Sequence, residues 1–155
     1  MSLLDKISIG IGKEVAIHRV LKTLTWKRFW NALKNTSSFL ISAIRKKPIV
    51  WGRPAIVNIE PTNICNLRCP LCITGSGQMK REPGMMDFEI YKSFVDTIAD
   101  TTIYITLYHQ GEPYLHPQFN EMVTYAKSYG CYVNTSTNAH YFQTMDKARA
   151  VVESG

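Results

Sequence analysis

The sequence predicts an α/β fold with parallel strands and helical crossovers, preceded by a basic helical arm. Two observations carry this prediction. Residues 55–155 alternate three times between short stretches rich in β-branched and aromatic residues and longer stretches with helical spacing of apolar residues. Residues 1–54 carry 11 Lys and Arg against 2 Asp and Glu, whereas residues 55–155 carry 7 against 10. The 155 residues thus divide into an arm (1–48), a linker (49–54) and one domain (55–155).

The arm contains two stretches with helical periodicity. The first stripe of apolar residues comprises Ile17, Val20, Leu21 and Leu24. The stripe re-phases near Thr25, which we expect to cap a second helix. That helix carries Trp26, Trp30, Leu33, Leu40 and Ile44. The basic residues 45–47 suit a helix C-terminus, and Pro48 ends the helix.

The arm allows three interpretations. A basic amphipathic helix with aromatic residues can lie on an anionic membrane, so weak membrane-surface contact through residues 1–47 is one. We favour a helical pair that packs on the core, or on residues outside this sequence, because the apolar face is split. Nucleic-acid binding is not expected, since no base-reading motif accompanies the charge.

The elements of the domain follow in order. The expected strands span residues 55–60, 102–108 and 131–137, and the first is expected to be buried. The expected helices begin at Asp87, Pro117 and Met145, and Gly130 ends the second. The inward side chains of the first helix are Tyr91, Phe94, Val95 and Ile98. Those of the second are Phe119, Met122, Val123 and Ala126.

Each strand ends in a distinctive polar cluster. A cysteine loop follows the first, Gly111-Glu112-Pro113 the second, and Ser136-Thr137-Asn138 the third. Active residues of parallel sheets and barrels gather at the C-terminal ends of the strands. Three strands do not close a barrel. Residues 55–155 therefore resemble the first three βα units of a TIM-like barrel, apparently cut at Gly155.

Three cysteines lie within eight residues, at Cys65, Cys69 and Cys72. A structural zinc site is one alternative, although it usually takes four ligands as two separated pairs. A thioredoxin-like pair, Cys69 and Cys72, is another, but it leaves Cys65 without a role. Three thiolates that grip one metal cluster leave one metal position open for chemistry. Cys131 is expected to be a small core residue.

The CxxxCxxC spacing after a strand resembles the radical S-adenosylmethionine (radical SAM) superfamily. Residues 60–63 (Glu-Pro-Thr-Asn) and the clusters after strands two and three agree with it. Within the superfamily, these motifs most resemble those of the branch that often carries a C-terminal SPASM or twitch auxiliary-cluster domain. The resemblance covers about residues 53–155 and implies that they form the N-terminal half of a radical SAM core.

The resemblance implies a role for each motif residue. Cys65, Cys69 and Cys72 would each bind one iron of a [4Fe–4S] cluster, and the fourth iron would be chelated by SAM. Reductive cleavage of SAM would give a 5′-deoxyadenosyl radical that abstracts hydrogen from an unidentified substrate. Leu71 would pack near the adenine.

The remaining motifs would hold the cofactor. Gly111-Glu112-Pro113 resembles a GGEP motif that binds the methionyl amino group, with Gln110 in place of the first glycine. Asn138 stands where the family has a TNG motif, with Ala139 in place of the glycine, and would contact SAM.

Other expectations complete the prediction. An electron donor such as flavodoxin or ferredoxin would be a partner. No signal peptide or long apolar run is recognised, which favours a cytoplasmic, reducing location. The alternative function is a non-catalytic iron–sulfur or zinc-binding fragment. His109 is a candidate pocket residue, His116 a turn or capping residue, and Lys80 with Arg81 candidate contacts for an acidic substrate.

Overall fold

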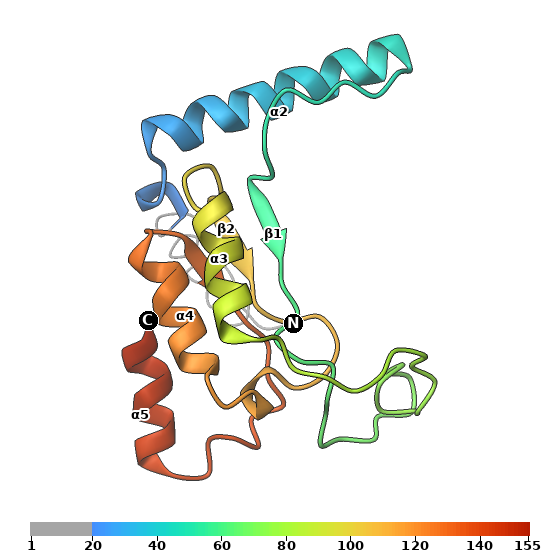
Figure 1. Ribbon diagram of the computed structural model, residues 1–155, viewed down its shortest axis with the longest axis vertical. Coiled ribbons are helices and arrows are strands. Elements are labelled where there is room, and N and C mark those ends of the chain that lie inside the picture. The colour runs from blue at the N-terminus through green and yellow to red at the C-terminus, as the bar shows by residue number, and fades with distance from the viewer. Residues whose placement is uncertain (1–19) are drawn as a thin grey trace, which may run out of the picture.

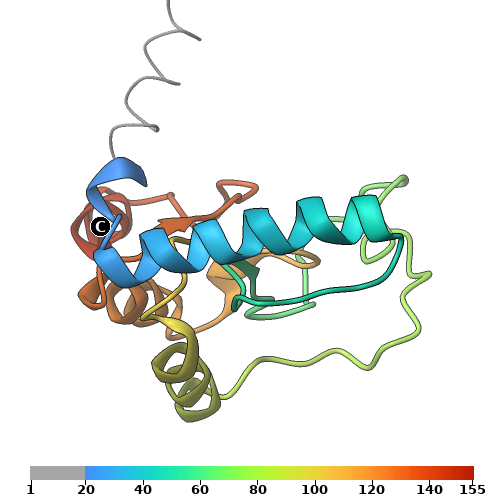
Figure 2. The same ribbon diagram turned by 90° about the horizontal axis from the view of Figure 1, so that it is seen from above.

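The computed structural model describes residues 20–155, as a small parallel sheet with helices on one side and a long helix across one end (Figures 1 and 2). The strands are β1 (Ile56–Asn58), β2 (Tyr104–Thr106) and β3 (Tyr132–Asn134), paired in parallel in that order. The helices are α2 (Trp26–Arg45), α3 (Phe88–Ile98), the 3₁₀ turn η1 (Pro113–Leu115), α4 (Phe119–Ser128) and α5 (Met145–Ser154). The predicted α/β class and element order are confirmed, and the sheet is open. Ile17, where the first stripe of the arm begins, lies outside the described residues.

Helices pack on only one of the two faces of the sheet. Val57, Ile105 and Val133 are register partners and pack into the core beneath α3 and α4. The alternate positions point to the other face, where Ile56 is 70% exposed and Tyr104 stacks near the ring of Tyr132. The expectation that the first strand is buried is therefore wrong. The helices pack on the opposite face of the sheet, so the side chain of Ile56 is left exposed.

Helices α3 and α4 supply most of the core. Asp87 caps α3 by accepting hydrogen bonds from the backbone N–H groups of Glu89 and Ile90. Three of the four expected inward residues of α3 are buried, but Phe94 is 43% exposed because it lies at the margin of the apolar stripe. All four expected inward residues of α4 are buried. This helix begins at Phe119 and not at Pro117, because the turn that follows η1 still occupies residues 116–118.

Helix α2 begins and ends as the sequence predicts. The Thr25 hydroxyl accepts a hydrogen bond from the backbone N–H of Arg28, and Lys46 closes the helix in the left-handed conformation. The helix crosses the N-terminal ends of the strands (Figure 1). Its contacts are polar: the Asn31 side chain donates to the carbonyls of Arg53 and Thr101, just before β1 and β2. Among the described residues, no helix is both long and apolar enough to span a membrane.

Arg28 is the anchor of α2. Its guanidinium is 2% exposed and donates to the carbonyls of Ala99, Tyr129 and Gly130 at 2.7–2.9 Å. Ala99 and Tyr129 are the C-terminal caps of α3 and α4. Carbonyls at helix C-termini lack intrahelical donors and carry partial negative charge, so a cation at this point satisfies both helices at once.

Replacement of Arg28 tests this anchor. The variant Arg28→Met keeps the apolar stem but leaves buried carbonyls without donors, and we expect it to lower the free energy of unfolding by about 3 kcal/mol. Lys34→Met, on the exposed side of the same helix, is the control and should change it by less than about 0.5 kcal/mol. Urea unfolding measures the loss, and hydrogen exchange reports whether α2 detaches first. Equal stability of the two variants would contradict the assignment.

Candidate cofactor site at the strand ends

Glu112 joins the exits of all three strands. Its backbone N–H donates to the carbonyl of Ile64 in the cysteine loop at 2.8 Å. Its buried carboxylate accepts from the Thr137 hydroxyl at 2.6 Å and from the Asn138 backbone N–H at 2.7 Å, both beyond β3. The N–H of Tyr114 in η1 supplies a third donor, at 3.3 Å. The structure therefore brings the predicted residues 111–113 and Asn138 together with the start of the cysteine loop.

Gly111 is required by close contact. Its φ is +75°, and a Cβ there would lie 2.6 Å from the carbonyl oxygen of Thr62 and 2.7 Å from that of Ile64. Both the left-handed conformation and the lack of space exclude an ordinary side chain. The glycine lets the β2 exit lie directly against the backbone that leads to Cys65.

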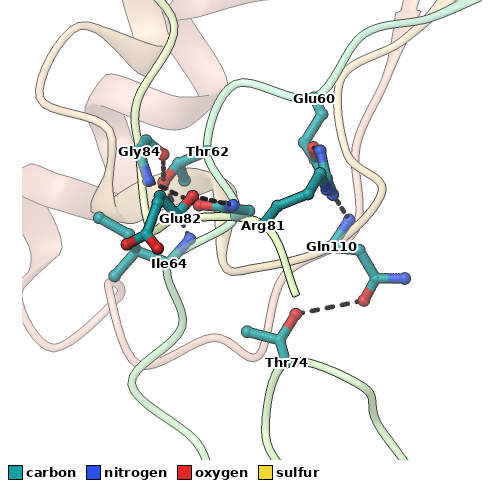
Figure 3. Close-up of polar contacts among 9 residues, drawn as sticks. Glu60, Thr62, Ile64, Thr74, Arg81, Glu82, Gly84 and Gln110 are labelled. Carbon is teal, nitrogen blue, oxygen red and sulfur yellow. Dashed lines mark hydrogen bonds and ion pairs between the residues drawn. The ribbon is translucent and has the colours of Figure 1, made fainter. Parts of the chain in front are cut away.

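The cysteine loop is closed at its base by polar contacts (Figure 3). The Thr62 hydroxyl donates to the carbonyl of Gly84, and the Asn63 amide donates to the carbonyl of Glu82. The Gly84 N–H returns a hydrogen bond to the Asn63 side-chain oxygen at 2.7 Å, and the Met86 N–H bonds to the Pro61 carbonyl. Residues 61–86 thus form one loop whose two ends are fixed to each other.

An ion pair braces the same loop from the side. Arg81 donates two hydrogen bonds to Glu60, at 2.5 and 3.0 Å, and Glu60 also accepts from the backbone N–H of Gln110 (Figure 3). The Arg81 guanidinium lowers the pKa of the Glu60 carboxyl below its ordinary value. The carboxylate therefore links the end of β1, the cysteine loop and the end of β2. Arg81, a candidate for contact with an acidic substrate, has its charge paired within the protein, while Lys80 is exposed.

The three cysteines differ in environment. Cys65 and Cys72 are half-buried and Cys69 is exposed, all as free thiols. The backbone N–H groups of Gly75 and Thr74 lower the pKa of the Cys72 thiol, which favours the thiolate that metals bind. Gly75 packs tightly: a Cβ there would lie 2.5 Å from the backbone nitrogen of Cys69.

The spacing of these thiols bears on the metal they suit. Within residues 20–155, no three His, Cys, Asp or Glu side chains gather as ligands of a single ion. Thiolate ligands of one zinc ion lie about 2.3 Å from it and so crowd together. Thiolates of a four-iron cluster each bind a different iron and stand further apart. A loop with three free thiols, each able to bind a different iron, is a donor set that fits an iron–sulfur cluster.

Gln110 reaches back toward the loop. Its side-chain oxygen accepts from the Thr74 hydroxyl at 3.2 Å (Figure 3). The same oxygen lies 3.9 Å from the Cys72 sulfur. The residue that departs from the GGEP pattern is therefore in contact with the cysteine loop through its side chain, while its backbone N–H is held by Glu60.

A pocket of about 400 Å³ opens beside Glu112. Asn66, His140 and Lys147 also line it. The Asn138 side chain donates to Asn66 at 2.8 Å, and Asn66 contacts the His140 ring. The sequence analysis missed Asn66, His140 and Lys147. The position of Asn66 directly after Cys65, and of His140 two residues after Asn138, would have indicated the first two.

The remaining sequence candidates are scattered. Leu71 is fully exposed on the loop, and His109 is exposed at the end of β2. His116 is buried and bonds the Met86 carbonyl and the Gln118 N–H, which confirms a turn-stabilising role. Cys131 is buried at the opposite end of the sheet, as expected of a core residue.

Comparison with known proteins identifies the class. The model of the radical SAM superfamily matches residues 59–155, which include the cysteine loop, β2, β3 and the exits of all three strands, but not β1 itself. The chain therefore belongs to the radical SAM superfamily, and the resemblance seen in its motifs is confirmed.

Individual relatives are similar over part of their length. Mycofactocin maturase MftC of Mycobacterium tuberculosis is 34% identical over 85 residues, which cover 55% of this chain and 21% of that protein. The tungsten-containing aldehyde ferredoxin oxidoreductase cofactor-modifying protein of Pyrococcus furiosus is 33% identical over 82 residues, 52% of this chain and 22% of that protein. The chain thus matches about a fifth of the length of these relatives.

A solved structure shares the fold. BtrN, crystallised in complex with AdoMet and 2-DOIA, superposes with a TM-score of 0.56 at 23% identity, over 65% of this chain and 42% of that one. An open conformation of BtrN gives 0.53 at 21% identity, over 65% and 46%. The open three-stranded sheet therefore corresponds to part of a radical SAM core.

Substitution of Gly111 tests the close contact at the β2 exit. Gly111→Ala places a Cβ against two backbone oxygens at positive φ, and we expect it to lower the free energy of unfolding by at least about 2 kcal/mol. Gly84→Ala is the matched control on the same loop base, since no atom lies within 4 Å of the added Cβ. Urea unfolding of both variants gives the comparison. A tolerated Gly111→Ala would show that the close approach is not maintained.

The Glu60–Arg81 pair predicts a pH dependence. A carboxyl with a lowered pKa in the folded state contributes stability above its unfolded pKa, ordinarily 4.5, and loses it as the pH falls through the folded value. The stability difference between cluster-free wild type and Glu60→Gln should therefore be full at neutral pH and shrink below about pH 4.5. Glu153→Gln, which removes an exposed carboxyl, is the control. Urea unfolding across this range measures the difference, and a pH-independent gap would exclude the ion pair as its source.

Proposed function

We propose that residues 55–155 form the cofactor-binding part of a radical SAM enzyme, with Cys65, Cys69 and Cys72 as ligands of a [4Fe–4S] cluster. When bound, cluster and SAM would together supply a 5′-deoxyadenosyl radical that abstracts hydrogen from the substrate. The observation that carries the proposal is the direct bonding of the cysteine loop to Glu112, and of Glu112 to Asn138. Superfamily membership supports the same function.

The residues of the protein would bind SAM and orient it. Glu112 has three of its roughly four acceptor positions filled by Tyr114, Thr137 and Asn138, and it faces the pocket. The remaining position is free to bind the amino group of SAM through a charge-assisted hydrogen bond. Because the carboxylate is fixed by three donors, it would meet this cation without reorganisation. Leu71, Gly111 and Pro113 would complete the cofactor contacts.

The proposed branch and role of the enzyme are inferred from its similarity to known relatives. Similarity to a maturase and to a cofactor-modifying protein supports placement in the SPASM or twitch branch and a role in maturation or cofactor modification. A reductant such as flavodoxin or ferredoxin would deliver the electron, and the cytoplasm is the proposed location.

The alternative is an iron–sulfur or zinc-binding fragment that does not turn over. The short span shared with the relatives is the observation that favours it. Cleavage of SAM by the protein after anaerobic reconstitution separates the two functions, because a binding fragment would hold iron and leave SAM intact.

Alanine variants of the cysteines test the cluster. We expect about four irons per chain in the wild type, and loss of most of the iron and of 5′-deoxyadenosine formation in Cys65→Ala, Cys69→Ala and Cys72→Ala. Cys131→Ala should keep both, because that thiol is buried at the other end of the sheet. Iron analysis, visible absorbance and chromatography of SAM products provide the measurements. Tight zinc binding with no iron uptake would rule out the proposed cluster.

A further inference from the structure

Helix α2 turns its apolar side away from the protein. At 100° per residue, its polar residues Arg28, Asn31, Asn35, Ser38 and Ser42 fall on one half of the helix. All of these except Ser38 form side-chain hydrogen bonds to residues outside the helix. The opposite half forms what we name the aromatic face of α2, which consists of Trp26, Phe29, Trp30, Leu33, Leu40 and Ile44.

The aromatic face is exposed along its whole length. Trp26 is 72% and Ile44 81% exposed, although they lie at opposite ends of the helix. At the N-terminal end, the Trp26 ring stacks on Phe29 at 5.9 Å and meets Trp30 edge-on at 5.4 Å. The exposed apolar residues form two groups on this side, Trp26 to Leu33 and Leu40 with Ile44, and exposed apolar residues gathered on one side of a helix are typical of an interaction site.

Helix α2 packs on the domain, as the favoured interpretation of the arm expects, but it does so through its polar side. An amphipathic helix normally buries its apolar stripe. In α2 the polar side makes the contacts, through Arg28 to the ends of α3 and α4 and through Asn31 to the residues before β1 and β2. The polar anchor fixes the rotation of the helix and so commits the aromatic face to the outside.

The aromatic face of α2 points away from the sheet, which limits which other segments could pack on it. Helix α2 lies across the N-terminal ends of the strands (Figures 1 and 2). Asn31 on its polar side bonds the residues just before β1 and β2, so the sheet lies on that side. Further strands added beside β1 or β3 would extend the sheet laterally and would meet the flank of the sheet, not the outer side of α2. Growth of the barrel therefore does not supply the partner.

Charge indicates the chemistry of the partner. Residues 15–59 contain nine Lys and Arg and no Asp or Glu. Lys27, Lys34 and Arg45 fall within about 20° of one another on the helical wheel, along one border of the aromatic face, and Lys46 and Lys47 follow. A cationic border beside a Trp-rich apolar face is complementary to the headgroup region of an anionic bilayer, where indole rings also prefer to lie.

We propose that α2 lies in the plane of an anionic phospholipid surface, with its aromatic face at the boundary between headgroups and acyl chains. The polar side would remain docked on the domain through Arg28. The cysteine loop, at the opposite ends of the strands, would then face the aqueous phase. This proposal rests on α2 alone and is independent of whether the loop holds a cluster.

Vesicle co-sedimentation of the full-length protein tests the proposal. Wild type should bind phosphatidylcholine vesicles that contain phosphatidylglycerol, with a blue shift of Trp fluorescence, and should bind pure phosphatidylcholine much less. Phe29→Ser with Trp30→Ser should weaken binding about tenfold or more, since each ring buries apolar area in the interface. Phe94→Ser is the matched control, because Phe94 on α3 is as exposed as Phe29, at 43%.

Two double variants measure the electrostatic contribution to vesicle binding. Lys34→Glu with Arg45→Glu should abolish the preference for anionic vesicles. Lys80→Glu with Arg149→Glu changes the net charge equally, away from α2, and should leave the preference in place. Absence of vesicle binding by the wild type would overturn the proposal. So would a dimer, detected by light scattering, that the Phe29 and Trp30 substitutions dissociate, since a second copy would then be the partner.

Discussion

The buried carboxylate of Glu112 holds the candidate site together. Parallel strands deliver their C-terminal ends to one edge, but the edge becomes a site only if the loops beyond it are fixed relative to one another. Glu112 does this by accepting from Thr137 and Asn138 beyond β3, while its backbone N–H bonds Ile64 beyond β1. A buried carboxylate is costly unless it is fully hydrogen-bonded. The same donors that stabilise it therefore set the geometry of the rim.

A second polar centre, Arg28, organises the opposite end of the sheet. Its guanidinium binds carbonyls at the C-terminal ends of α3 and α4, and Asn31 binds the segments that enter β1 and β2. At one end of the sheet, the cationic Arg28 side chain donates to carbonyls at helix C-termini. At the other end, the Glu112 carboxylate accepts hydrogen bonds from the loops. Between them the strands are three residues long, about 10 Å. The apolar core can be small because both ends are fixed by directional bonds.

The sequence predicts most of the fold because periodicity and caps are local signals. Thr25, Asp87 and Gly130 each bound an element as expected. The exposure of Ile56 could not be read from the sequence, since β-branched composition reports a strand and not which neighbours cover it. The cysteines and residues 111–113 were found from spacing, but the filled acceptor positions of Glu112 depend on Thr137 and Asn138, which only the folded chain brings near. The anchoring role of Arg28 was not predicted, although its position opposite the aromatic stripe distinguishes it from the other basic residues of the helix.

The two ends of the sheet also separate two kinds of chemistry. Radical chemistry requires a site from which water and oxygen are excluded, and the face of the sheet opposite α3 and α4 carries a row of polar residues, Asn58, Thr106 and Asn134, one step before that rim. Chain that covers this face would enclose the space beside the cysteine loop. The outer side of α2 would need no such enclosure, because the proposed surface binding depends on an accessible aromatic face. A helix docked by polar groups meets that requirement: the anchor at Arg28 can form without using any of the aromatic face, so folding and surface binding do not compete for the same side chains.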